Sequence, residues 1–167
     1  SALLDISKLD AGVVRPNIGP VVVADLFKRL ETEYQSHGIN LYGNLRERRR
    51  FQRLETERQS PDHTCGNALR MRPSRAIVRS DPTMLERILR NLISNALRYT
   101  RNGRVLVGAR CRGGMLRVEV HDTGPGIPEE QLDNIFLEFH QLGNPERDRH
   151  QGLGLGLAIV KRLAALL

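Results

Sequence analysis

Two asparagines four residues apart, Asn91 and Asn95, lie in a stretch whose apolar residues recur with helical spacing. Side chains four residues apart project from the same side of a helix, and Arg98 continues that line about one turn later. An amide oxygen is a neutral, hard ligand that suits Mg²⁺, which shares the phosphates of a nucleotide. This flank is therefore a candidate metal and phosphate site. The alternative is that both amides only hydrogen-bond to neighbouring backbone.

A carboxylate follows a β-prone stretch, residues 115–122. Three apolar residues of this stretch share one face, namely Leu116, Val118 and Val120. By parity Asp122 continues that face, and a charged carboxylate directed at the core is costly unless it meets a hydrogen-bond donor. The exocyclic amine of adenine is such a donor, and Gly124 and Gly126 leave room for a flat base. The alternative is an ordinary Asp-x-Gly turn.

A glycine-rich stretch precedes the last apolar helical pattern and contains Gly152, Leu153, Gly154 and Gly156. A helix N-terminus offers unpaired N–H groups to an anion, and glycines let phosphate oxygens come close. The stretch lacks the Gly-Lys-Ser/Thr of a P-loop, and no β-α-β unit surrounds it. Taken together, the three motifs predict a nucleotide pocket with a metal-binding amide, a base-binding carboxylate and a phosphate-facing helix end.

The elements that would position these residues can be read from the surrounding pattern. Asp81-Pro82 is a good helix start, because Asp can accept from open backbone N–H groups and Pro tolerates the first helical position, and we expect this helix to end near Tyr99. A hairpin is expected to turn at Gly113-Gly114. Further strands are predicted at 17–23, 68–71, 76–78, 104–111 and 115–121, and further helices at 1–12, 25–34, 129–136 and from Gly154 onward.

The bulk properties fit one domain of a larger protein. The 167 residues have a natural size for a single unit, and both ends read as parts of helices that continue.

The net charge of +7 comes from scattered arginines, so we expect no nucleic acid as a partner. No apolar run approaches the roughly 20 residues of a membrane span, so we expect no membrane contact. Cys65 and Cys111 fit a reduced compartment rather than a metal site or a structural disulfide.

Two stretches are less readable. We expect residues 40–67 to form an insertion or a mobile loop. Within this stretch, residues 46–58 include six arginines and three glutamates. That part is either a solvated surface or an exposed basic helix that binds a partner. Residues 123–152 are rich in Gly, Pro and charge beside the phosphate site, which favours a flexible lid, the alternative being a loop without a role.

As a set, these motifs resemble the catalytic and ATP-binding domain of bacterial sensor histidine kinases, in the superfamily of DNA gyrase, heat-shock chaperone and mismatch-repair ATPases. Residues 91–100 are similar to the N box, 122–126 to the first glycine box, 136–139 to the F box and 152–156 to the second glycine box. The resemblance implies an α/β fold, a two-layer sandwich in which a mixed β-sheet is covered on one face by three helices, with a flexible ATP lid.

The resemblance also implies roles for single residues. Asn95 would hold Mg²⁺, Asn91 would lie beside the phosphates and Arg98 would contact them. Tyr99, which could otherwise be core filler, would stack on the purine, and Asp122 would accept from the adenine amine. Gly124 and Gly126 would shape the base site, and the segment from Gly152 through Leu153 and Gly154 to Gly156 would frame the triphosphate of ATP.

Residues 1–12 resemble the end of the dimerisation and phosphoacceptor domain, and 13–167 the catalytic domain. The acceptor histidine of such proteins lies upstream of Ser1, and the five histidines of this chain lack its local context. The implied partners are that upstream domain, in a homodimer, and the receiver domain of a response regulator. The implied location is cytoplasmic, and the chain alone is expected to bind ATP without phosphorylating itself.

Asn91 helps to separate a kinase from a hydrolase. The ATPases of the superfamily place a water-activating glutamate four residues before the metal-binding asparagine. A neutral amide is a poor general base, so attack by water should be slow and the γ-phosphoryl group kept for another nucleophile. The alternatives that remain are an ATPase of the same fold and a nucleotide-sensing pseudokinase.

Overall fold

Strand β5 (Arg104–Arg112) lies inside a mixed four-stranded sheet whose order is β2-β3-β5-β6. It pairs in parallel with β3 (Ala68–Met71) and antiparallel with β6 (Met115–Asp122), and β3 pairs in parallel with β2 (Asn40–Leu41). The turn between β5 and β6 is at Gly113 and Gly114, whose φ angles of 59° and 77° suit glycine. The predicted hairpin is confirmed.

The computed structural model describes residues 7, 9–41, 67–100, 102–139 and 154–167.

A second, two-stranded sheet precedes the helix that carries the asparagines. Its strands are β1 (Gly19–Val22) and β4 (Ile77–Ser80), which pair antiparallel with Val21 opposite Val78. β4 extends two residues beyond the predicted strand and leads directly into the next helix. This short ribbon therefore sets where that helix begins.

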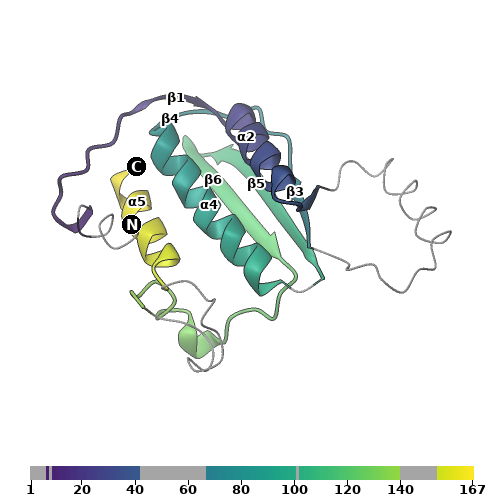
Figure 1. Cartoon of the computed structure of the whole chain (residues 1–167). Helices are drawn as coiled ribbons and strands as arrows, with labels where there is room; N and C mark the ends of the chain where they lie inside the picture. Colours follow the sequence, from purple (N-terminus) through teal and green to yellow (C-terminus); the bar gives the residue numbers. More distant parts are fainter. Residues whose placement is uncertain (1–6, 8, 42–66, 101, 140–153) are drawn as a thin grey trace, which may run out of the picture.

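Three helices lie on the same side of the four-stranded sheet: α2 (Val23–Ser36), α4 (Pro82–Tyr99) and α5 (Gly156–Leu166). In Figure 1, α4 runs along β6, with α2 on one side of it and α5 on the other. The contacts agree, because α4 packs on β5, β6, α2 and α5. The predicted α/β architecture, a mixed sheet with three helices, is confirmed.

Two apolar clusters hold this arrangement together, and α4 contributes to both. The first joins α2 and α4 to the sheet, with Leu30, Leu89, Ile93, Val105 and Val107 among its fully buried members. The second joins α4 to α5 and consists of Met84, Ile88, Leu155, Ile159, Val160 and Leu163. Apolar burial of this kind is the main stabilising term in folding. It places α5 on the flank of α4 that faces away from α2.

The N-terminus of α4 is capped as predicted. Oδ1 of Asp81 accepts from the backbone N–H groups of Thr83 and Met84, both at 2.9 Å, and Pro82 occupies the first turn. Oδ2 accepts from the backbone N–H of Asn17 at 2.7 Å. Burial by itself would raise the pKa of Asp81, but these three hydrogen bonds outweigh it and hold the pKa below its ordinary value.

The other end of α4 is held by a residue from outside the helix. Nδ2 of Asn67 donates to the carbonyls of Leu97 and Thr100, at 2.5 and 2.6 Å. Oδ1 of the same side chain accepts from the backbone N–H of Gly103 at 3.2 Å. Asn67 therefore ties the last turn of α4 to the start of β5.

Some predicted elements differ from the structure. In place of a helix over 129–136, a 3-10 turn η1 (Glu129–Gln131) is followed by further turns, and because none of the residues of η1 is buried, no packing stabilises a longer helix. The last helix begins at Gly156 and not at Gly154, which has a left-handed φ of 68°. Part of the predicted N-terminal helix is present at Leu9 and Asp10, and Gly12 follows with φ 64°.

Several predictions fall on segments outside the described residues. These are most of the N-terminal helix, residues 42–66 of the expected insertion together with Cys65, and residues 140–153, which include Gly152 and Leu153. Cys111 is exposed and is a free thiol. Within the residues described, the structure holds no helix with both the length and the apolarity that crossing a bilayer requires.

Candidate functional site

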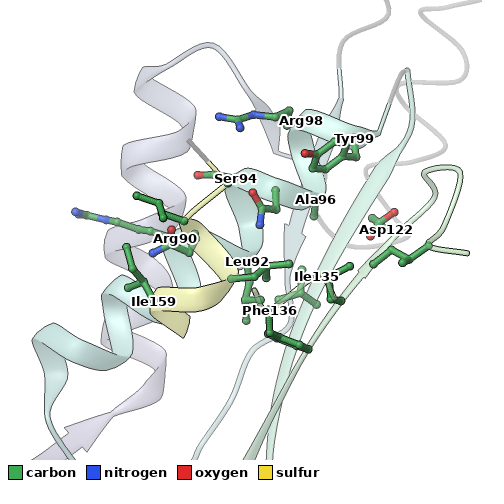
Figure 2. A pocket seen from close by; sticks show the side chains of 18 of the residues that line it. Arg90, Leu92, Ser94, Ala96, Arg98, Tyr99, Asp122, Ile135, Phe136 and Ile159 are labelled. Atoms are coloured by element: carbon green, nitrogen blue, oxygen red, sulfur yellow. The ribbon is translucent and has the colours of Figure 1, made fainter. Parts of the chain in front are cut away.

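A cavity of about 790 Å³ lies between α4, the end of β6, the segment after it and the first turn of α5. Its size falls in the range of small-molecule sites. Figure 2 shows side chains from these separate elements around it. The cavity is lined by most of the predicted site residues: Asn91, Asn95, Arg98, Tyr99, Asp122, Gly126, Gly154 and Gly156. Gly124 is not part of this lining but is a close neighbour of Asp122 and Tyr99, which are.

The two asparagines of α4 face the first residue of α5. Nδ2 of Asn91 donates to the carbonyl of Arg87 one turn earlier, at 2.9 Å. Oδ1 of Asn91 lies 3.0 Å from the point that a Cβ atom would occupy at Gly156, and Nδ2 of Asn95 lies 3.8 Å from the same point. Only the absence of a side chain at Gly156 allows this approach without displacement.

The start of α5 forms part of the cavity wall, through Gly154, Leu155, Gly156 and Leu157. Among the described residues no side chain caps this helix, so its first N–H groups are free to meet an anion. Leu155, just before it, is only 3% exposed and belongs to the apolar cluster of α4 and α5. Burial of Leu155 therefore holds the helix end beside Asn91.

Asp122 lies at the far end of the cavity from α5. It pairs with Val105 in the sheet, on the same face as Val120, as parity predicted. The side chain is exposed, however, and not aimed at a closed core. The reason is that Asp122 is the last residue of β6, where the open cavity takes the place of packed side chains. Its Oδ1 accepts from the backbone N–H of Gly124 at 2.8 Å.

Gly124 allows the chain to turn closely under the end of α4. A Cβ atom at this position would lie 2.8 Å from Oδ1 of Asp122 and 3.0 Å from the backbone oxygen of Tyr99. The first distance is shorter than a Cβ contact allows and the second is tight, so a larger residue would displace the carboxylate of Asp122 and press on the end of α4. The glycine thereby keeps Asp122 and Tyr99 on one wall.

Arg98 and Tyr99 form the rim of the cavity at the end of α4, and both are exposed. Figure 2 shows Arg98 extending away from Asp122, with Tyr99 between the two. Arg98 also borders a smaller groove between α2 and α4, which is lined in addition by Tyr34 and His37. It is thus a cation at the edge of the cavity rather than at its floor.

Sequence reasoning missed two kinds of lining residue. One is a set of apolar residues, all labelled in Figure 2: Leu92, Ile135, Phe136 and Ile159. The other is a pair of arginines on α4, Arg87 and Arg90. Arg90 is engaged with Glu33 at 2.7 Å and Glu86 at 2.8 Å. A signal for Arg87 was available, since it precedes Asn91 by the same four residues that separate the two asparagines.

Sequence relatives of the chain are sensor proteins of bacteria. The aerobic respiration control sensor protein ArcB of Escherichia coli is 45% identical over 91 residues, which cover 51% of this chain and 11% of ArcB. The sensor histidine kinase RcsC of Salmonella typhimurium is 39% identical over 87 residues, covering 52% and 9%. The sensor protein KdpD of Rathayibacter rathayi is 32% identical over 159 residues, covering 95% and 15%. The chain therefore spans only a small part of the length of these relatives.

The fold is also similar to solved structures. Full-length ShkA in complex with AMPPNP superimposes with a TM-score of 0.66 at 26% identity, covering 99% of this chain and 29% of ShkA. The histidine kinase AdeS of Acinetobacter baumannii gives a TM-score of 0.66 at 20% identity, covering 99% and 64%. A family model described as "Histidine kinase-, DNA gyrase B-, and HSP90-like ATPase" matches residues 80–167, which carry the cavity. The chain thus belongs to the histidine kinase-, DNA gyrase B- and HSP90-like ATPase family.

Proposed function

We propose that the chain binds Mg-ATP in the cavity and serves as the catalytic domain of a two-component sensor histidine kinase. The γ-phosphoryl group of ATP would pass to a histidine on an adjoining dimerisation domain and then to an aspartate of a response regulator. The names of the sequence relatives support this, and so does the AMPPNP complex of a structural neighbour. The observation that carries the proposal is the amide of Asn91 at the phosphate end of the cavity.

The residues present fit a magnesium nucleotide. The open first turn of α5 offers backbone N–H groups to phosphate oxygens, and the position of Gly156 leaves space for them beside Asn91. Asn95 supplies a hard oxygen ligand for Mg²⁺, which usually takes few protein ligands and keeps several waters. When bound, Mg²⁺ neutralises phosphate charge during transfer. Arg98 would add a positive charge at the rim.

The base would bind at the other end of the cavity. Asp122 would accept a hydrogen bond from the exocyclic amine of adenine while its Oδ1 remains bonded to the N–H of Gly124. We assign the adenine amine to Oδ2, because Oδ1 already accepts from Gly124. Tyr99 and the apolar wall around Ile135 and Phe136 would cover the faces of the purine. The polar contacts would orient the base, and the apolar contacts would exclude water.

Asn91 accounts for transfer to a histidine rather than to water. Its Nδ2 is committed to the carbonyl of Arg87, and an amide cannot take a proton from water near neutral pH. A nucleophile that carries its own basic lone pair, such as a neutral imidazole, needs no such base. We therefore infer that the histidine is supplied by the adjoining domain, and that the 167 residues alone bind ATP without becoming labelled.

The test is labelling with γ-phosphate-labelled ATP of a longer version of the protein that includes the adjoining histidine domain. We expect acid-labile label on that domain, little steady release of phosphate, and loss of the label in Asn95→Ala. Steady release without label would favour a hydrolase. Binding of Mg-ATP with neither label nor release would favour a nucleotide sensor.

A further inference from the structure

Arg162 on α5 contacts two carboxylates that come from distant parts of the chain. Its Nε donates to Oδ1 of Asp10 at 2.6 Å and its Nη2 to Oδ2 of Asp10 at 3.2 Å. The same Nη2 also donates to Oε1 of Glu138. A guanidinium that meets a carboxylate through two N–H groups is held in a defined orientation. Arg162 therefore joins the N-terminal segment, α5 and the segment after η1 through one side chain.

This contact is a partly exposed ion pair at the surface. The side chain of Arg162 is 28% exposed, and those of Asp10 and Glu138 are 53% and 35% exposed. Hydrogen bonding to Arg162 lowers the pKa of Asp10, and the bond to Asp10 raises the pKa of Arg162. Exposed ion pairs contribute little to stability by themselves. The effect of Arg162 is therefore expected in the relative placement of three segments and not in the stability of the fold.

Apolar contacts place the N-terminal segment on the same helix. Leu9 and Val14 pack against the cluster in which α4 meets α5, which includes Leu155, Ile159 and Leu163. Residues 155, 159 and 163 follow one another at four-residue intervals along the helix, and Arg162 lies beside this stripe. The ion pair and the apolar contact thus fix the same stretch of the N-terminal segment to α5.

Arg162 and its partner Glu138 are close in the chain to residues that line the cavity. Ile159, one turn before Arg162, lines the cavity, and so does Phe136, two residues before Glu138. Asp10, Arg162 and Glu138 are absent from the lining themselves. A displacement of Asp10 would reach the cavity through the side chain of Arg162, along α5 and along the segment of Glu138.

We propose that Arg162 is a positioning residue that couples the placement of the N-terminal segment to the occupancy of the cavity. This rests on the proposed ATP site. Coupling between two sites is reciprocal, so a nucleotide that favours the present placement of α5 and Glu138 also favours the contact with Asp10. In the longer protein, the segment that leads into the catalytic domain would in this way respond to bound nucleotide.

The first experiment measures AMPPNP affinity of the 167-residue chain by calorimetry in the presence of Mg²⁺. Arg162→Ala is expected to weaken binding about fivefold, at the lower end of usual coupling strengths. Arg162→Lys keeps the charge but loses the pair of N–H groups that meet the carboxylate. Its affinity for AMPPNP should lie between those of the wild type and Arg162→Ala. Lys161→Ala is the matched control, because Lys161 is the exposed neighbour on the same helix. This variant is expected to bind AMPPNP as tightly as the wild type does. Thermal melts confirm that each variant is folded.

Asp10→Asn distinguishes coupling to nucleotide binding from a purely structural role of Arg162. Asp10 is outside the cavity, yet its loss should weaken AMPPNP binding in the wild-type background and have no further effect in Arg162→Ala. In the reciprocal measurement, AMPPNP should slow amide hydrogen exchange of residues 9–14 in wild type but not in Arg162→Ala. Additive effects, or equal exchange in both proteins, would overturn the coupling.

The two proposals fail differently. If the wild-type chain binds AMPPNP and Asp10→Asn and Arg162→Ala bind it equally well, the coupling is wrong and the ATP site stands. If the wild-type chain does not bind AMPPNP, the ATP site is wrong and the coupling with it.

Discussion

Oδ1 of Asn91 lies 3.0 Å from the position that a Cβ atom would take at Gly156. The amide of α4 is therefore in close contact with the first residue of α5. The apolar cluster behind them, with Leu155 at the helix start, keeps the two helices at this separation. The open N-terminus of α5 therefore lies beside the amides of α4, although 65 residues separate Asn91 from Gly156 in the sequence.

Gly156→Ala should weaken nucleotide binding while leaving the fold intact. The added methyl group would meet Oδ1 of Asn91 and occupy the space assigned to phosphate oxygens. We expect about a tenfold loss of affinity, or about 1.4 kcal/mol. Isothermal calorimetry with AMPPNP and Mg²⁺ measures it. Gly19→Ala is the control, because a Cβ atom there meets nothing within 4 Å. Equal affinities of the two variants would show that phosphates do not bind beside Gly156.

Asp122→Ala should remove the hydrogen bond to the adenine amine. A hydrogen bond to a charged group contributes about 1.5–3 kcal/mol, so we expect roughly a ten- to hundredfold loss of ATP affinity. Because guanine carries a carbonyl where adenine carries its amine, the preference for ATP over GTP should fall as well. Asp133→Ala, an exposed aspartate outside the cavity lining, is the matched control. Wild-type affinity and preference in Asp122→Ala would contradict the assignment of the base.

Asn95→Ala should remove the dependence of nucleotide binding on Mg²⁺. With its amide oxygen absent, the metal loses its one proposed protein ligand, and we expect similar AMPPNP affinity with Mg²⁺ and with EDTA. Titrations of the wild type and the variant under both conditions provide the measurement. A variant that retains the full gain from Mg²⁺ would place the metal ligand elsewhere.

Asn91→Glu should increase steady phosphate release. The substitution introduces a carboxylate that can accept a proton from water, at the position where the amide of Asn91 cannot. Phosphate release under saturating Mg-ATP is the readout, and Asn91→Gln is the control because it lengthens the side chain without adding a base. Release that is no higher in Asn91→Glu than in Asn91→Gln would mean that the identity of residue 91 does not separate transfer from hydrolysis.

Asp81→Ala should destabilise the fold in a pH-dependent way. Loss of a helix N-cap costs about 1 kcal/mol, and the bond to Asn17 is lost as well. Since the folded pKa of Asp81 is lowered, its ionised form stabilises the fold above the unfolded pKa of about 3.9, and this contribution is lost as the pH falls through the folded value. Urea unfolding should therefore separate wild type and Asp81→Ala most at pH 7, and the separation should shrink as the pH falls below the unfolded pKa. Asp25→Ala, in the first turn of α2, should show only a small difference.

Much of the fold could be predicted from local sequence. Asp81-Pro82 marks the start of α4, and Gly113-Gly114 marks the hairpin, because a cap and a left-handed turn depend on residues that are neighbours in the chain. The same holds for the shared flank of Asn91, Asn95 and Arg98, which follows from helical geometry alone. The prediction for 129–136 was too long, because a helix of that size depends on packing that this exposed segment lacks.

The candidate site was predictable in its chemical groups but not in its walls. Sequence motifs pointed to the amides, to Asp122 and to the glycines. They could not indicate that Asp122 is exposed, because parity along a strand says which face a residue shares and not whether that face is covered at the strand end. Phe136 begins the stretch that is similar to the F box, but neither Phe136 nor Ile135 was predicted to line the pocket.

The sequence by itself determined the groups that chemistry requires and the local elements that carry them, since both depend on contacts within a few residues. Only the tertiary structure decided how those elements meet. Asn67 holds the last turn of α4 from 30 residues away, and Arg162 binds Asp10 across 152 residues. Such contacts arise when apolar faces pack and bring distant backbone and side chains within hydrogen-bonding distance. No periodicity in the sequence encodes them.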